Sequence, residues 1–383
     1  MKKNLKRKIN LTYPKQIINE IIKKKLSLYE SFFPNTKYNF DFKKINKFKK
    51  FKTVIVIGMG GSILGTKAIY SFLKHKINKK FIFIDNLNHN YLLKLKKENN
   101  ISKSLFLVIS KSGNTSETIV NLSFFQSFLK KTNVIIISEN KDNILRNFAK
   151  KKSFYFISHD KNIGGRYSIF SDTGMLPTYL MGIKPKNIKK TIPYLIKNKK
   201  FLSQNIKKIS KINIKKTKII IFLNYVPELN NFLYWCQQLL AESLGKKGKG
   251  FIPIISNAPK DHHSLLQLYL DGPKDKIYYV FSSTYKRKLK VNSKVFGHNA
   301  EYLNKKNFEK IKLSQKNALI RVLKDKKIPF REININKFNE NTIGELFFLF
   351  IFETIFLAKI LKINPYDQPA VEKVKVLTKK LLT

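Results

Sequence analysis

The chain has 383 residues, enough for two ordinary domains with well-buried cores. Its apolar share of 43% is that of a soluble globular protein, and its single cysteine, Cys236, excludes an internal disulfide and predicts a reducing cytoplasm. The net charge of +52 suggests a polyanionic partner, but the lysines are spread along the whole chain without a zinc-ligand cluster or an aromatic RNA-binding signature. We therefore expect no specific nucleic-acid partner.

The start of the chain is basic but lacks the apolar core of a secretory signal, because LTYPKQIINE follows MKKNLKRKIN. We expect residues 1–45 to form an N-terminal helical segment. In residues 46–185, short β-rich apolar runs alternate with amphipathic stretches such as ILGTKAIYSFLK and ETIVNLSFFQSFLK, a pattern typical of βαβ units. The predicted strands are TVIVI from Thr53, FIFID from Phe81, LFLVIS from Leu105, VIIIS from Val134 and FYFIS from Phe154.

A lysine-rich segment from Lys186 to Lys216 then joins two halves of the chain, and we predict a linking helix pair there. Its apolar positions are Ile192, Leu195, Phe201 and Leu202. The strand pattern resumes with IIIFL from Ile219, GFIPIIS from Gly250, KIYYVFS from Lys276 and IPFREI from Ile328. The sequence therefore predicts an α/β protein of two successive αβα sandwich domains with parallel sheets, residues 46–185 and 186–362, and a ligand cleft between them.

One apolar stretch, from Ile343 to Leu361, is long enough to cross a membrane. It contains Glu345 and Glu353, and an acid near the centre of a bilayer costs about 2.5–3.5 kcal/mol. We therefore predict a buried helix of the second domain and no membrane partner.

A glycine-rich loop, VIVIGMGGSILG, places Gly58, Gly60, Gly61 and Ser62 between a predicted strand and a predicted helix. Glycines there let the backbone approach a ligand, and a helix N-terminus favours an anion. The spacing does not fit a dinucleotide fingerprint, because Ile63 stands where that motif needs glycine. It does not fit a Walker A loop either, because Thr66 and Lys67 follow Gly65 in the wrong order. By itself the loop is equally consistent with a plain tight turn.

A second loop, SKSGNTSET, concentrates short hydroxyl and amide side chains between the strand LFLVIS and a helix start. An ordinary helix cap requires one such residue, Thr115 or Ser116 here. The surplus of donors favours a site that binds several phosphate oxygens at once.

These two strand–loop–helix units resemble the sugar isomerase domain of phosphosugar isomerases and phosphosugar-binding regulators. The resemblance implies that the serine–threonine loop grips a sugar phosphate and that the glycine loop lies beside the sugar. The substrate-binding residues it implies are Gly61, Ser62, Ser110, Lys111, Ser112, Thr115 and Thr118.

Four further segments resemble motifs of the phosphoglucose isomerase family. IGGRYSIFSDTG is similar to its GGR(F/Y)S segment, and QQLLAESLGK to its QxxxESxGK stretch. HSLLQL is similar to its HxxxQL element, and YDQPAVEKVK to its C-terminal FDQxGVExxK signature, with Tyr366 for Phe and Ala370 for glycine. The C-terminal segment, residues 363–383, is expected to complete the active site.

The resemblance implies an aldose–ketose isomerase that interconverts glucose 6-phosphate and fructose 6-phosphate through a cis-enediol(ate), without metal or other cofactor. Glu242 is then the proton-transferring base and Arg166 stabilises the enediolate charge, since its guanidinium stays cationic. His263 and Lys375 assist ring opening, with His262 the less favoured histidine. Gln238 and Gln368 are the further substrate-binding residues.

In that family the histidine comes from the partner subunit, so the resemblance also implies a homodimer with His263 shared across subunits. Two alternatives stay open at this point: a bifunctional isomerase that also accepts mannose 6-phosphate, and a phosphosugar-binding regulator without catalysis. Taken singly, Arg166, Glu242, His263 and Lys375 each fit an ordinary surface or capping role.

Overall fold

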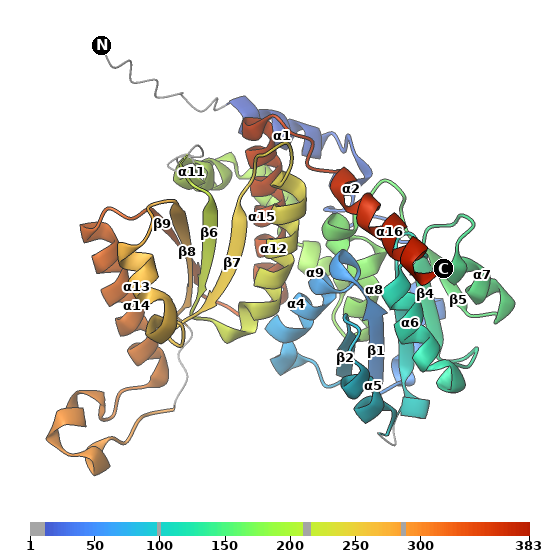
Figure 1. Cartoon of the computed structure of the whole chain (residues 1–383), viewed down its shortest axis with the longest axis horizontal. Helices are drawn as coiled ribbons and strands as arrows, with labels where there is room; N and C mark the ends of the chain where they lie inside the picture. Colours follow the sequence, from blue (N-terminus) through green and yellow to red (C-terminus); the bar gives the residue numbers. More distant parts are fainter. Residues whose placement is uncertain (1–11, 98–100, 210–215, 285–288) are drawn as a thin grey trace.

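The apolar runs form two parallel sheets in a computed structural model of the chain (Figure 1). The structure describes residues 12–97, 101–209, 216–284 and 289–383. Within these, the first sheet has the order β2-β1-β3-β4-β5 and the second the order β7-β6-β8-β9. The strands are β1 (Thr53–Gly58), β2 (Lys80–Ile84), β3 (Leu105–Ile109), β4 (Val134–Ser138), β5 (Tyr155–Ser158), β6 (Ile219–Asn224), β7 (Ile252–Asn257), β8 (Lys276–Ser283) and β9 (Phe330–Ile335).

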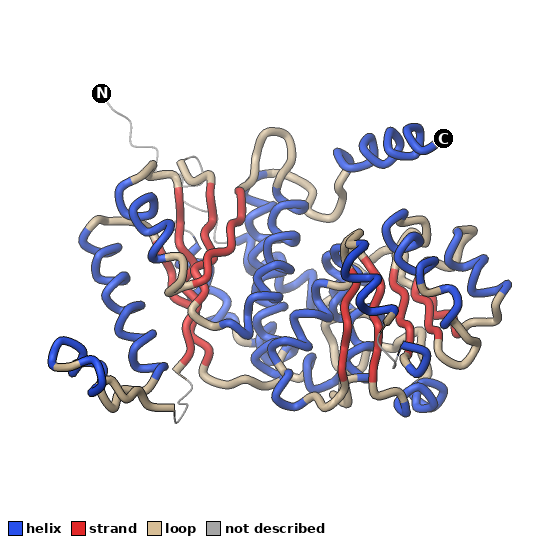
Figure 2. The backbone as a smooth tube through the Cα atoms, turned by 60° about the horizontal axis from the view of Figure 1, so that its bottom comes forward, coloured by secondary structure: helices blue, strands red, loops and turns tan. Residues whose placement is uncertain are grey.

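Helices cover the faces of both sheets, so the central strands are buried on both sides and read as continuous apolar runs (Figures 1 and 2). In the first half they are α1 (Thr12–Ile22), α2 (Ser27–Glu30), α3 (Phe42–Asn46), α4 (Leu64–Phe72), α5 (His89–Lys96), α6 (Ser116–Phe124), α7 (Ile144–Lys151) and α8 (Asp172–Leu180). In the second half they are α9 (Pro185–Lys189), α10 (Ile192–Lys197), α11 (Lys199–Ile209), α12 (Asn230–Leu244), α13 (His262–Asp271), α14 (Phe308–Asp325), α15 (Glu340–Leu361) and α16 (Glu372–Leu382).

The predicted α/β class with two parallel sheets is confirmed, and every predicted strand is present. The segment 117–130 differs: α6 ends at Phe124, and a 3₁₀ turn (Gln126–Phe128) replaces its last turns because Phe125 turns inward, fully buried, against Phe106. The linking segment holds three short helices, α9 to α11, where a pair was expected; its residues 210–215 lie outside the described part. The domain limits at 45, 185 and 362 stay predictions, and residues 1–11 of the N-terminal segment are also not described.

The stretch from Ile343 to Leu361 forms most of α15, a long helix packed against α12, α9 and α1. Glu353 in its middle is fully buried, and each of its two carboxylate oxygens has a partner. Its Oε2 lies 2.6 Å from Nη2 of Arg331, and its Oε1 accepts a 2.7 Å hydrogen bond from the hydroxyl of Tyr279. Among the helices that the structure describes, none meets the length and apolarity needed to cross a membrane.

The Arg331–Glu353 pair gives a stability prediction. Glu353→Leu leaves a buried guanidinium without a counter-charge, and we expect the free energy of unfolding to fall by about 3–5 kcal/mol. Replacing both residues, Glu353→Leu with Arg331→Met, removes both charges and is expected to recover most of that loss. The free energy of unfolding of both variants is measured by urea denaturation.

The control is Lys76→Ala, which breaks a 2.8 Å pair with Glu340 in which the lysine side chain is 40% exposed. Exposed pairs contribute about 0–1 kcal/mol, so this loss is expected to be small. Equal losses for Glu353→Leu and Lys76→Ala would contradict the buried-charge explanation.

Candidate active site

The glycine loop and the serine–threonine loop lie side by side, because they follow β1 and β3, which are neighbours in the first sheet. The chain runs from β1 outward to β2 and then back to β3 on the other side. The point between β1 and β3 is therefore a topological switch point, where open parallel sheets bind ligands at the carboxyl ends of their strands.

In the serine–threonine loop, the N-cap side chain does not bond the first turn of α6. Thr115 is the N-cap residue of α6 but makes no side-chain hydrogen bond to the helix; its hydroxyl lies 2.8 Å from that of Ser110. The hydroxyl of Thr118 is fully buried and has no hydrogen-bond partner within the described structure. The capping explanation therefore fails for Thr115, and the loop offers hydroxyls and the first turn of a helix to an anion.

Lys111, the cation of this loop, points away from the hydroxyls. Its Nζ donates a 2.8 Å hydrogen bond to the carbonyl oxygen of Lys161 and lies 3.7 Å from a carboxylate oxygen of Glu139. Partial burial lowers the pKa of its ammonium, although Glu139 opposes this shift. Lys111 therefore contributes a nearby charge that is already shared with protein groups.

The glycine loop packs against the segment that carries Arg166. A Cβ atom on Gly61 would lie 2.2 Å from the carbonyl carbon of Gly165 and 2.4 Å from the nitrogen of Arg166. At Gly60, where φ is +50°, a Cβ atom would lie 2.7 Å from Nε2 of Gln238 on α12. These glycines are thus required for the close approach of three segments, and a plain turn does not explain them.

Arg166 is the centre of the site. It is 2% exposed, and its guanidinium is bonded along every edge. Its Nε donates to the hydroxyl of Ser243 (2.8 Å), and Nη1 donates to Oε2 of Glu242 (3.1 Å) and to Oε1 of Gln368 (2.7 Å). Its Nη2 donates to the carbonyl oxygens of Pro365 (2.7 Å) and Asp367 (3.0 Å). One side chain thus joins α12 and the C-terminal segment to the first sheet.

Glu242 lies at this junction and is partly exposed. Its side chain is 34% exposed, and its second oxygen, Oε1, accepts a 2.8 Å hydrogen bond from Nε2 of Gln238 one turn earlier on α12. Oε1 of Gln238 is buried without a hydrogen-bond partner in the described residues. The carboxylate is held by one cation and one amide, yet it remains accessible from the loops.

Several residues that position this site were not singled out by sequence reasoning. The hydroxyl of Tyr167 lies 2.8 Å from that of Ser243, and both support Arg166. Lys246 forms a 2.6 Å ion pair with Asp367 and also donates to the carbonyl oxygen of Asn364. All of these but Asn364 stand inside the quoted motifs, Tyr167 in GGR(F/Y)S, Ser243 and Lys246 in QxxxESxGK and Asp367 in the C-terminal signature, but the motifs gave them no role.

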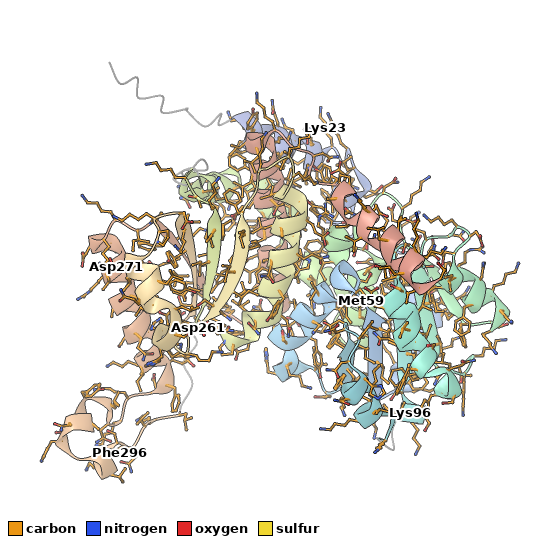
Figure 3. The ribbon with its side chains drawn as sticks, in the orientation of Figure 1. Lys23, Met59, Lys96, Asp261, Asp271 and Phe296 are labelled. Atoms are coloured by element: carbon orange, nitrogen blue, oxygen red, sulfur yellow. The ribbon has the colours of Figure 1, made fainter. Side chains whose placement is uncertain are left out.

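Two predicted residues are not brought to the site within this chain. His263, in the first turn of α13, is exposed, and Lys375 on α16 is 65% exposed and paired with Glu372 at 2.7 Å. The two sheets point in opposite directions: in Figure 3, Met59 after β1 lies above Lys96 at the end of α5, whereas Asp261 after β7 lies below Asp271 at the end of α13. His263, two residues after Asp261, therefore lies at the carboxyl end of the second sheet, which faces the opposite way from the carboxyl end of the first sheet.

No group of three or more histidine, cysteine, aspartate or glutamate side chains in the described ranges is arranged to hold a metal ion. The titratable groups of the site instead pair with one another and with the backbone. Complete burial raises the pKa of the Tyr167 phenol, although the charge of Arg166 opposes the shift. Tyr167 is therefore a neutral hydrogen-bonding group at physiological pH.

Comparison with known proteins gives a consistent result. A family model described as phosphoglucose isomerase matches residues 39–383. The chain is 33% identical over 358 residues to the glucose-6-phosphate isomerase of Methanocaldococcus jannaschii, covering 90% of this chain and 88% of that protein. It is 29% identical over 350 residues to the glucose-6-phosphate isomerase of Campylobacter jejuni, covering 86% and 85%.

Solved structures share the fold. A hypothetical protein from Thermus thermophilus has a TM-score of 0.83 at 23% identity, covering 97% of this chain and 95% of that one. A glucose-6-phosphate isomerase from Chlamydia trachomatis has a TM-score of 0.70 at 20% identity, covering 88% and 70%. At these identities the likeness shows the fold and no more.

The contact between Gly61 and Gly165 gives a prediction that needs no ligand. Gly61→Ala forces its methyl group into the backbone before Arg166, and we expect a loss of about 1–3 kcal/mol in stability. Trp235 is the only tryptophan, and its indole donates a 3.1 Å hydrogen bond to the carbonyl oxygen of Arg166, so its emission should also shift.

The matched control is Gly165→Ala, on the opposite side of the same contact. Its nearest neighbour would be Cα of Gly61 at 3.9 Å, an ordinary contact. Thermal unfolding and tryptophan fluorescence should therefore stay close to those of the parent chain. A silent Gly61→Ala, or equal effects of the two variants, would show that the glycine loop is not packed as described.

Proposed function

The chain belongs to the phosphoglucose isomerase family, and we propose that it interconverts glucose 6-phosphate and fructose 6-phosphate through a cis-enediol(ate). The observation that carries the proposal is the junction at Arg166, whose guanidinium bonds both Glu242 and Gln368 from two separate motifs. The glycine loop that packs against this junction follows the strand next to that of the serine–threonine loop. The chemistry requires a carboxylate held near a bound sugar phosphate, and this junction supplies one.

The phosphate is proposed to bind at the start of α6. The hydroxyls of Ser110, Ser112, Thr115 and Thr118 lie there, and the unpartnered, buried Thr118 hydroxyl supports this assignment. Gly61 and Ser62 then lie beside the sugar, because the glycine loop follows the neighbouring strand. Anion binding at a helix N-terminus uses free N–H groups and the helix dipole together.

Glu242 is proposed as the base. It removes a proton from C2 of the open-chain aldose, and the electrons move into the carbonyl at C1 to give an enediolate with its negative charge on O1. The hydroxyl proton of O2 then moves to O1, and C1 takes a proton back from Glu242 as the C2–O2 bond becomes the carbonyl of the ketose. A single carboxylate reaches both carbons of a planar cis-enediol.

Arg166 has a more restricted part than the sequence implied. Each of its N–H groups faces an oxygen of this chain, so it stabilises an enediolate oxygen only by exchanging one partner. Gln368 is the exchangeable one, since its side chain is exposed whereas Ser243 is buried. We propose that substrate displaces the Gln368 amide from Nη1 and that Gln368 turns to a sugar hydroxyl.

The alternatives considered from the sequence gain no support from the relatives compared above, since those with an assigned activity are named glucose-6-phosphate isomerases. We propose that the reaction serves glycolysis and gluconeogenesis in the cytoplasm, in line with the single cysteine. Acceptance of mannose 6-phosphate is decided by the groups that face C2, and a direct comparison of the two sugars measures it.

We further propose a homodimer in which His263 of one subunit and Glu242 of the other form each site. His263 is exposed at the carboxyl end of the second sheet, and no hydrogen bond or ion pair joins it to Glu242 within the described residues. Residues 289–307 project from that same end, and their side chains at Val295, Phe296 and Tyr302 are at least 73% exposed (Figure 3).

The helix α16 is the second uncovered surface. It stands clear of the rest of the chain in Figure 2, and none of its residues is buried. Val374, Leu377 and Leu381 lie on one face of it and are 66%, 48% and 87% exposed. Apolar faces of this kind mark interaction sites, and docking against a second copy would also bring Lys375 into a defined environment.

Glu242→Gln tests the chemistry. The variant keeps shape and hydrogen bonding but removes the basic lone pair, so substrate binding should persist while turnover falls by about a hundredfold or more. Enzyme-dependent exchange of solvent deuterium into C1 and C2 should disappear as well. Glu30→Gln, at an exposed glutamate of α2, is the control and should leave both rates intact. Near-native turnover of Glu242→Gln would exclude it as the base.

Subunit mixing tests the shared site. His263→Ala and Glu242→Gln are each expected to be inactive. After equal mixing and random exchange, half of the dimers are mixed and each holds one intact site, so activity should return to about a quarter of the parent value. Sedimentation confirms the dimer and a tagged subunit confirms exchange. A monomer, or proven exchange without recovery, would count against the arrangement.

A further inference from the structure

Tyr225 and His262 form a hydrogen-bonded pair that the reaction as described above does not use. Tyr225 directly follows β6, is 3% exposed, and its hydroxyl lies 2.8 Å from Nε2 of His262, the first residue of α13. The two rings also meet edge to face, with centroids 5.6 Å apart. The tyrosine is buried and bonded through its only polar side-chain atom, so the pair fixes the orientation of the imidazole.

The start of α13 is held at a second point. Oδ2 of Asp261 accepts a 2.7 Å hydrogen bond from the backbone nitrogen of Asn257, the last residue of β7. Nδ2 of Asn224, the last residue of β6, lies 3.4 Å from Oδ1 of Asn257. Two consecutive residues, Asp261 and His262, are thus tied to the ends of two adjacent strands. His263 is the next residue and is exposed.

We propose that Tyr225 and His262 are positioning residues that hold His263 in the orientation needed for ring opening in the partner subunit. The inference rests on the proposed function and on the shared site. Because His263 must reach a sugar bound to another chain, its direction is set by the first turn of α13. A misplacement of about 1 Å at a reacting group costs on the order of a hundredfold in rate.

The charged groups around Tyr225 and His262 are consistent with a positioning role for His262. Burial lowers the pKa of His262, and the neighbouring His263 lowers it further while Asp261 opposes the shift. The other charged group there is Lys260, whose Nζ lies 3.8 Å from Oδ1 of Asp261. His262 is therefore a neutral hydrogen-bonding group at neutral pH, and its neighbour His263 is the histidine whose side chain is exposed.

The step in question can be separated from proton transfer at carbon. In ring opening of fructose 6-phosphate, His263 gives a proton to the ring oxygen as the C2–O5 bond breaks toward that oxygen. The anomeric hydroxyl loses its proton to water and becomes the carbonyl. A ketose without the 5-hydroxyl, 5-deoxyfructose 6-phosphate, stays open-chain and needs only Glu242 for deuterium exchange at C1.

Tyr225→Phe keeps the ring contact and removes the hydrogen bond. We expect kcat on fructose 6-phosphate to fall about tenfold or more with KM little changed, since phosphate binding uses other residues. Deuterium exchange into 5-deoxyfructose 6-phosphate should proceed at the parent rate. His262→Gln, whose amide can still bond the Tyr225 hydroxyl, should retain more activity than His262→Ala, and this rescue provides a second route should Tyr225→Phe fold poorly.

The matched control is Tyr278→Phe, at a tyrosine of the same sheet that is 1% exposed and donates a 3.1 Å hydrogen bond to the carbonyl oxygen of Tyr269. It should leave both rates unchanged. If Tyr225→Phe slows both substrates alike, or neither, the positioning role is wrong although the isomerase remains. If the parent chain itself fails to convert fructose 6-phosphate, the proposed function fails and the inference falls with it.

Discussion

The architecture of the site depends on one buried guanidinium. Arg166 takes its place because Gly61 and Gly165 let two backbone segments approach to a distance that any side chain on Gly61 would prevent. From there it bonds Glu242, Ser243 and a stretch near the C-terminus that lies some two hundred positions further along the chain. A buried cation must be fully paired, so these segments are held in one arrangement or the guanidinium is left unsatisfied.

The need to pair the Arg166 guanidinium explains the position of α12, a helix of the second half, against the first half of the chain. The packing of α12 on α4 buries apolar side chains such as Leu233 and Leu240, but apolar contact alone leaves the register of the two elements loosely specified. The polar contacts are directional and occur only when Glu242 lies opposite Arg166. Specificity of position thus comes from the ionic junction, and most of the stabilisation comes from the surrounding core.

The strands of both sheets and the two ligand loops could be predicted because each is recognisable from a short stretch of sequence. Apolar runs such as that of β3 and the hydroxyl-rich loop after it are legible within ten residues. The supporting roles of Ser243, Tyr167 and the backbone carbonyl of Pro365 were not predicted, because these contacts join residues far apart in the chain. Arg166 was found but its saturation by protein oxygens was not, since a motif shows which residue is present and not how many partners it has.

The opposed directions of the two sheets have a consequence for the whole reaction cycle. Groups at the carboxyl end of the first sheet are served by Arg166 and Glu242 of the same chain, whereas those at the carboxyl end of the second sheet, His263 among them, face away. The helices α12 and α15 pack on each other between the two sheets. Pairing two chains about a twofold axis would offer the His263 of each to the Glu242 of the other, and the exposed apolar side chains of α16 and near Phe296 are surfaces that such a pairing could cover.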